Sequence, residues 1–219
     1  MAAEISAKIV KELREKTSAG MMDCKKALQE ANGDFAKAEE ALKKKGLVTA
    51  EKKSGRIATE GIVEAYIHMG GKLGILVEVN CETDFVARRS EFQELARNIA
   101  MQIAACPQVQ YINGNDIPPE IAEIEKKVEM EKDDLGNKPV EIKEKIVAGR
   151  IQKKLNEMVL VNQPFIRDSS ITIEELVKKN IAALGENIQI RRFERFTLGE
   201  GLEKKNENFS DEVEKMIKK

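Results

Sequence analysis

Histidine and aromatic residues are scarce in this chain of 219 residues. It contains one histidine, two tyrosines and no tryptophan, and aromatic residues make up only 4% of it. A single histidine leaves most acid–base and nucleophilic constellations without a member. The sequence also has no P-loop and no GxGxxG motif, so it has no recognisable phosphate-binding loop. These absences argue against an enzyme, and no cofactor is expected.

An excess of charge of one sign is also missing. The 37 Lys and Arg residues nearly cancel the 38 Asp and Glu residues, which leaves a net charge of -1. A general nucleic-acid binder carries a basic excess that displaces counterions from phosphates. It commonly also has aromatic side chains on which bases stack. The composition therefore argues against direct binding of nucleic acid.

Cysteine pairs and long apolar runs are lacking as well. The three cysteines, Cys24, Cys81 and Cys106, include no CxxC pair, so neither a disulfide framework nor a zinc or other metal site is expected. No apolar run approaches the ~20 residues of a membrane span. The N-terminus lacks the basic and apolar regions of a secretory signal. We expect a protein of a reducing compartment, the cytoplasm or the matrix or stroma of an organelle.

Residues 1–46 predict a compact module of three helices. Gly20 separates the first two helices, and Asn32-Gly33 is a strong turn signal before Asp34, which is expected to cap the third. Gly46 is expected just past the end of this helix, followed by a linker or fraying helix over 47–56. The apolar positions at helical spacing are Ile5, Ile9, Val10 and Leu13, then Ala27, Leu28 and Ala31, then Phe35, Ala38, Ala41 and Leu42.

The pattern changes from helical to alternating in the next segment, 57–118, which is expected to form a core. Two β-rich runs, 62–68 and 73–79, flank Gly70-Gly71, which predicts a β-hairpin. A helix is expected from Ser90, with Ser90 and Gln93 as a capping box, and it should stop before Pro107.

The remaining segments complete an α+β fold with a small antiparallel sheet covered by helices. Charged residues over 119–158 predict a protruding antiparallel pair of helices. The core is expected to continue over 159–200, with a helix that starts at a Thr172–Glu175 capping box and a strand over 188–196. Arginines in this strand face either acids or water. A C-terminal helical module is expected over 201–219.

One turn between the hairpin and the next helix combines an acid and an exposed-looking aromatic residue. Asp84 is followed at once by Phe85, and loops held by a rigid scaffold commonly carry function. From the pattern alone the two residues are either a helix cap and a core residue or a contact with a partner. Because the next helix has its own expected cap at Ser90, the contact is favoured.

Two segments resemble the signatures of the elongation factor Ts family. Residues 13–28, LREKTSAGMMDCKKAL, resemble its N-terminal signature, and residues 78–88, EVNCETDFVAR, resemble its second signature. The resemblance extends through 163–165 and 199–201, so it covers nearly the whole chain. Ser18 is a departure, because the family usually has a glycine at this position.

The resemblance implies a guanine-nucleotide exchange factor for elongation factor Tu, the GTPase that delivers aminoacyl-tRNA to the ribosome. It implies that residues 83–86, here called the wedge turn, push between helices near the partner's Mg²⁺ site. It also implies a ubiquitin-associated-like N-terminal module that touches the partner's nucleotide-binding domain. The residues implied are Thr83, Asp84, Phe85 and Val86 in the wedge turn, and Arg14, Met21, Met22 and Lys25 in the N-terminal module.

Several residues and the oligomeric state keep more than one interpretation at the level of the sequence. Met21 and Met22 are either core residues or exposed contacts. His68, at the hairpin turn, is either solvated or matches a family histidine that contacts a second domain of the partner. The chain resembles the short members of the family, which implies a homodimer that binds two partner molecules. The alternatives are an adaptor for ubiquitin-like proteins and a ribosome- or RNA-associated factor that uses Arg191, Arg192 and Arg195.

Overall fold

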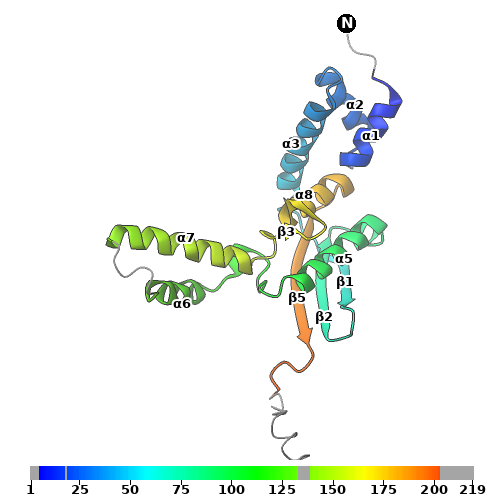
Figure 1. Ribbon diagram of the computed structural model, residues 1–219. Helices are drawn as coiled ribbons and strands as arrows, with labels where there is room; N and C mark the ends of the chain where they lie inside the picture. Colours follow the sequence, from blue (N-terminus) through cyan, green and yellow to red (C-terminus); the bar gives the residue numbers. More distant parts are fainter. Residues whose placement is uncertain (1–4, 18, 133–138, 203–219) are drawn as a thin grey trace, which may run out of the picture.

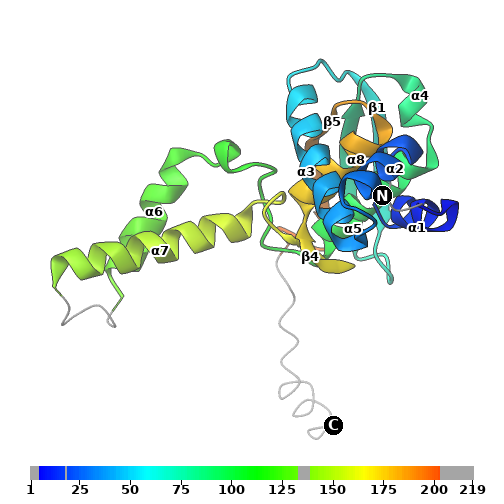
Figure 2. The ribbon, with the colours of Figure 1, turned by 90° about the horizontal axis from the view of Figure 1, so that it is seen from above.

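The computed structural model describes residues 5–17, 19–132 and 139–202. In these residues helices combine with a small antiparallel sheet, so the α+β class is confirmed. Figures 1 and 2 show the N-terminal helices, a sheet with its covering helices, and a helical arm that projects from them. Among the described helices none is long and apolar enough to cross a membrane.

The N-terminal helices are α1 (Ala7–Thr17), α2 (Met21–Glu30) and α3 (Phe35–Lys53), and they share a small core of their own. The turn between α2 and α3 places Asn32 and Gly33 at positive φ, as the turn signal predicted. Asp34 caps α3, because its carboxylate accepts a hydrogen bond from the Lys37 amide at 3.1 Å. The buried core residues are Val10, Leu13, Cys24, Ala27, Leu28, Ala38 and Leu42.

The third helix does not end at Gly46, and the prediction that this glycine follows the helix was wrong. Helix α3 continues without a break to Lys53. A Cβ at Gly46 would lie 3.4 Å from the Cβ of Ala182 in α8 (Ile173–Leu184), so the two helices are close at this position. The buried Ala50 continues this contact surface. Packing against α8 therefore keeps 47–53 helical.

The sheet has the order β1-β2-β5, with β1 (Glu60–Ile67), β2 (Leu73–Cys81) and β5 (Ile188–Thr197) all antiparallel to their neighbours. The predicted hairpin joins β1 to β2. Gly70 and Gly71 have φ of 92° and 67°, which glycine adopts readily. The His68 amide closes the hairpin with a 2.8 Å bond to the Leu73 carbonyl.

Helices cover one face of the sheet. Ile75, Val77 and Val79 of β2 are buried with the apolar side of α5 (Ser90–Ala105) and with residues of α8 in one core. Val63, Ile67 and Leu76 alternate with buried or half-buried positions of their strands and remain exposed. Successive side chains of a strand point to opposite faces, so these three lie on the sheet's uncovered face.

The arm consists of α6 (Pro119–Met130) and α7 (Val140–Met158), which lie side by side (Figures 1 and 2). Glu129, buried between them, binds Lys132 and pairs with Arg150, while Lys154 of α7 binds Glu125 of α6. These contacts fix how the two helices align.

The chain returns to the core through a small hairpin, β3 (Pro164–Phe165) and β4 (Asp168–Thr172), and a short 3-10 turn, η1 (Gly114–Asp116), precedes the arm. Helix α8 then starts with the predicted capping box. The Glu175 amide donates to the Thr172 hydroxyl and the Thr172 amide donates to the Glu175 carboxylate, each at 3.2 Å. Of the helical module expected over 201–219, all but the first two residues lie outside the described part of the chain.

Candidate partner-binding wedge

The wedge turn is the start of a short helix, α4 (Asp84–Ala87). Thr83 is its N-cap, and the Thr83 hydroxyl accepts a hydrogen bond from the Val86 amide at 3.4 Å. Asp84 therefore occupies the first turn of this helix, where the positive end of the helix dipole stabilises a carboxylate.

The predicted capping box at Ser90 was wrong. Arg89 holds the N-cap position of α5, without a side-chain cap bond, and Ser90 is already helical. The reason is the preceding helix: α4 leaves only Arg88 and Arg89 before α5, so Arg89 must take the extended conformation between them. Asp84 still does not cap α5, although the reason differs from the one inferred from sequence.

Helix α4 has a buried side and an exposed side. Val86, which the family resemblance places in the wedge turn, is only 7% exposed and packs in the core together with Ala87. Phe85 is 78% exposed. Val86 thus fixes the helix to the scaffold, while Phe85 presents an aromatic ring to solvent.

The Asp84 carboxylate lies beside this ring in sequence and is partly exposed. It forms an ion pair with Arg88, one turn later, at 2.8 Å. Such a surface pair has little net stabilising energy. The carboxylate can therefore exchange Arg88 for another cation at small cost.

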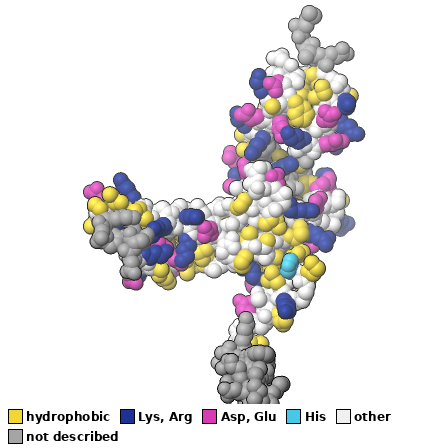
Figure 3. All heavy atoms as spheres, in the orientation of Figure 1, with side chains coloured by type: hydrophobic (Ala, Val, Ile, Leu, Met, Phe, Trp, Pro, Cys, Tyr) yellow, Lys and Arg dark blue, Asp and Glu magenta, His cyan; other side chains and the backbone are white. Residues whose placement is uncertain are grey.

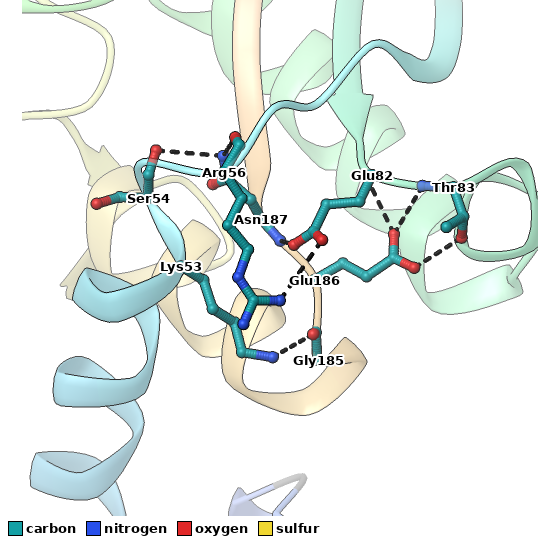
Figure 4. Close-up of polar contacts among 8 residues, drawn as sticks. All are labelled: Lys53, Ser54, Arg56, Glu82, Thr83, Gly185, Glu186 and Asn187. Carbon is teal, nitrogen blue, oxygen red and sulfur yellow. Dashed lines mark hydrogen bonds and ion pairs between the residues drawn. The ribbon is translucent and has the colours of Figure 1, made fainter.

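The base of the wedge turn is held by a residue from the far end of the chain (Figure 4). The Glu186 carboxylate accepts hydrogen bonds from the amides of Glu82 and Thr83, at 3.1 and 3.0 Å. It also accepts a 2.6 Å bond from the Thr83 hydroxyl. Charge-assisted bonds of this kind are stronger than neutral ones.

Cys81, directly before this base, is fully buried. Its thiol donates to the Thr83 carbonyl at 3.1 Å. Burial, and then the negative charge of Glu186, raise the pKa of the Cys81 thiol to about 11. Cys81 is therefore a protonated structural residue at neutral pH.

The N-terminal residues of the predicted site lie at the surface of α1 and α2. Arg14, Met21, Met22 and Lys25 are all exposed, and Met22 is 74% exposed. Arg14 and Met21 line a groove of about 780 Å³ between the N-terminal helices and the core, whereas Met22 and Lys25 do not.

The core side of this groove consists of residues that the sequence reading did not single out. Arg89 and Glu91 come from the start of α5, directly after the wedge helix, and Leu176 and Lys179 come from α8. The groove thus extends from the N-terminal signature to the element that follows the second signature. Sequence spacing gives no signal for it, because α3 and α8 set the distance between the two parts.

His68 lies outside both of these regions, at the hairpin turn. It is exposed, and its Nδ1 is 3.1 Å from the Tyr66 hydroxyl. Figure 3 shows hydrophobic side chains beside the one histidine. The structure therefore places His68 at the β1–β2 hairpin, between the exposed Ile67 and Met69, and not in the wedge turn.

The three arginines of β5 have partners within the chain. Arg191 and Arg192 bind the Glu78 carboxylate at 2.9 and 2.7 Å, and they hold the pKa of Glu78 below its usual range. Arg195 donates to the carbonyls at the end of α5, those of Ile103, Cys106 and Pro107. Their binding of protein groups weakens the case for an RNA-binding surface.

Together these features define a class of protein that acts by binding to another macromolecule. Its site is an exposed phenylalanine and a carboxylate on a short helix. Val86 and the bonds of Glu186 fix this helix to the core, and the groove begins directly after it. Within the described ranges no group of three or more His, Cys, Asp or Glu residues is arranged to hold a metal ion.

Comparison with known proteins gives the family. Residues 1–200 match the family model described as Elongation factor TS. The chain is 76% identical to "Elongation factor Ts, chloroplastic" of Rhodomonas salina and 75% identical to the protein of that name of Guillardia theta, over the full length of each. It is 66% identical to Elongation factor Ts of Rippkaea orientalis, over 96% of this chain and 85% of the relative. The chain belongs to the elongation factor Ts family.

Proposed function

We propose that this chain is a guanine-nucleotide exchange factor that binds elongation factor Tu and promotes release of GDP. Membership of the elongation factor Ts family supports the role in translation elongation and the choice of partner. The observation that carries the mechanism is the exposure of Phe85 on a helix whose other side is buried. An exposed ring on a fixed support is suited to insertion into a partner.

In the proposed mechanism Phe85 enters between helices of the partner near its Mg²⁺ site. Asp84, released from Arg88, adds a negative charge close to the ions that hold the nucleotide. Both effects favour the nucleotide-free partner over the GDP-bound form. The exchange factor itself makes and breaks no covalent bond, so we propose that it is not an enzyme.

The energetics require more than the wedge turn. By linkage, the factor by which the chain weakens GDP binding is the factor by which GDP weakens binding of the chain. A thousandfold effect needs roughly 4 kcal/mol of differential binding. Burial of one phenylalanine contributes roughly 1.5–3 kcal/mol. Contacts of Arg14, Met21, Met22 and Lys25 with the partner's nucleotide-binding domain would contribute the remainder.

We also propose that two chains associate through the uncovered face of the sheet. Large apolar side chains gather there and at its hairpin end: Val63, Ile67, Met69, Leu76 and Phe196. Exposed apolar side chains that gather on one surface are typical of an interaction site. The dimer would bind two partner molecules, and His68 of one chain would then contact the partner held mainly by the other.

The setting we propose is a cytoplasm or an organelle stroma, and the names of the chloroplastic relatives support the stroma. The adaptor for ubiquitin-like proteins and the RNA-associated factor remain the competing functions. No feature beyond the three helices favours the first, and the engaged arginines of β5 disfavour the second.

The proposal is tested by stopped-flow measurement of fluorescent GDP release from purified elongation factor Tu. The chain is expected to accelerate release in a concentration-dependent, saturable manner. Equal release rates with and without the chain, at concentrations where a complex forms, would contradict the proposal.

A further inference from the structure

The wedge turn and the turn after α8 lie side by side, although more than a hundred residues separate them (Figure 4). Glu186, and Glu82 directly before the wedge turn, each accept hydrogen bonds from the backbone of the other segment. Glu186 accepts from the amides of Glu82 and Thr83, while the Glu82 carboxylate accepts from the Asn187 amide at 2.6 Å. We call this reciprocal pair, Glu82 and Glu186, the clamp.

The clamp is also joined to the end of the N-terminal module. The Asn187 side chain, in a residue only 1% exposed, donates to the carbonyls of Ser54 and Arg56, at 3.2 and 2.7 Å. Lys53, the last residue of α3, donates to the Gly185 carbonyl, and Arg56 pairs with Glu82. The clamp therefore connects α3 and the wedge turn through hydrogen bonds that are partly removed from solvent.

The Thr83 hydroxyl links the clamp to the direction of Phe85. Its proton is directed to Glu186 by the 2.6 Å bond, which leaves its oxygen lone pairs free to accept from the Val86 amide. That acceptor bond caps α4, and α4 carries Phe85. If the carboxylate were absent, the hydroxyl would lose the partner that orients it, and the first turn of α4 would lose its fixed geometry.

We propose that Glu186 is a positioning residue for nucleotide exchange: it sets the conformation of Thr83, and thereby the direction in which Phe85 projects. This inference rests on the proposed exchange function. Glu186 lies beneath the wedge turn and acts through the capping residue, not through contact with the partner. Its loss should reduce the maximal rate of GDP release more than it reduces binding of the partner.

The first measurement needs no partner. Amide hydrogen exchange is compared by NMR in the full chain for wild type, Glu186→Gln and Glu174→Gln. Glu174 is the matched control, because it lies in the first turn of α8 and its carboxylate pairs with Lys178 of the same helix. In Glu186→Gln the Glu82 and Thr83 amides should exchange at least about tenfold faster, since a side-chain amide no longer provides the charge-assisted acceptor. Unchanged protection of both amides would contradict the claim that the Glu186 carboxylate holds them.

The second measurement is GDP release at a series of chain concentrations. Glu186→Gln should lower the maximal stimulated rate about tenfold, as expected for loss of a charge-assisted bond, and leave the half-saturating concentration within about threefold. Thr83→Val, which removes the hydroxyl and keeps both backbone amides, should slow release in the same way. Thermal unfolding of each variant identifies a loss of rate that comes from unfolding.

A double-mutant cycle with Phe85→Ala separates positioning from general stabilisation. If Glu186 acts through Phe85, Glu186→Gln should change the rate by less than about twofold in the Phe85→Ala background. The same loss in both backgrounds, or a higher half-saturating concentration at an unchanged maximal rate, would overturn the inference. A wild-type chain that does not accelerate release would overturn the proposed function and, with it, this role for Glu186. The amide exchange would still decide whether the clamp exists.

Discussion

At the scale of single residues, Phe85 is exposed although the short helix that carries it is anchored in the core. Its neighbours Val86 and Ala87 are buried, and nothing in the described core uses the ring. We predict that Phe85→Ala will reduce the maximal rate of stimulated GDP release at least tenfold, because burial of the ring contributes up to about 3 kcal/mol. Association should weaken less, because the proposed contacts of the N-terminal module are unaffected by this change.

The matched control for this variant is Ile57→Ala, which removes an exposed apolar side chain outside α4 and the groove. Stopped-flow release and partner binding are measured for both variants. Wild-type stimulation by Phe85→Ala would remove Phe85 from the mechanism.

Cys81 gives a second test at this scale. Because its pKa is about 11 rather than the usual 9.0, its thiolate is about a hundredfold less populated at pH 8, and burial slows reagents further. We expect iodoacetamide to label Cys81 in the native protein far more slowly than in urea, as followed by peptide mass spectrometry. Rapid native labelling would mean that the base of the wedge turn opens readily.

The same pKa shift predicts how stability depends on pH. The folded chain holds the Cys81 proton more tightly than the unfolded chain does. The stabilisation from the protonated thiol is therefore fully present below pH 9 and is lost as the pH rises toward 11. Urea unfolding at pH 8 and pH 10.5 should show a smaller loss of stability in Cys81→Ala than in wild type. An equal loss in the two proteins would assign the pH dependence to other groups.

At the scale of elements, two glycines that resemble helix ends have opposite roles. Gly46 lies inside α3, whereas Gly185 ends α8 at φ 81°. We predict that Gly46→Ala will be neutral or will stabilise the protein by up to about 1 kcal/mol, the difference in helix propensity. Gly185→Ala should destabilise it by about 1–2 kcal/mol, since an L residue in this conformation is strained.

Urea unfolding of the two variants distinguishes these cases. Strong destabilisation by Gly46→Ala would mean that α3 ends at Gly46 after all, or that the contact with Ala182 admits no methyl group.

Most elements could be predicted from the sequence because their signals are local. Periodicity gave the helices, the Gly70-Gly71 pair gave the hairpin, and Thr172 with Glu175 gave a capping box. Gly46 and Ser90 misled because the deciding contacts are not local. Helix α3 continues past Gly46 where it packs against α8, and the short α4 displaces the cap of α5 to Arg89.

For the candidate site too, local features could be predicted from the sequence and contacts between distant segments could not. The acid–phenylalanine pair stands out in the sequence, and the structure adds that Phe85 is exposed while Val86 is buried. Glu186 and Asn187 carried no signal, because their partners are more than a hundred residues distant. The acceptors of Arg195 were likewise hidden, since they are backbone carbonyls at the end of α5.

At the scale of the whole molecule, the uncovered sheet face is exposed in a monomer and would be buried in the proposed dimer. We predict that light scattering at micromolar concentration will give twice the 24.5 kDa mass of one chain. Phe196→Glu, which places a charge on that face, should shift the mass toward the monomer. Val128→Glu on the arm is the control and should leave it unchanged, since Val128 is exposed but lies on α6. A wild-type mass of one chain would contradict the dimer.

The central claim is that the whole chain binds the nucleotide-free partner in preference to the GDP-bound one. The most direct test is calorimetric titration of the chain into elongation factor Tu, once without nucleotide and once with saturating GDP. We expect the affinity for the nucleotide-free form to exceed the affinity for the GDP-bound form by the same factor by which the chain weakens GDP binding. Equal affinity for the two forms would contradict it, because a ligand that binds both states equally shifts neither.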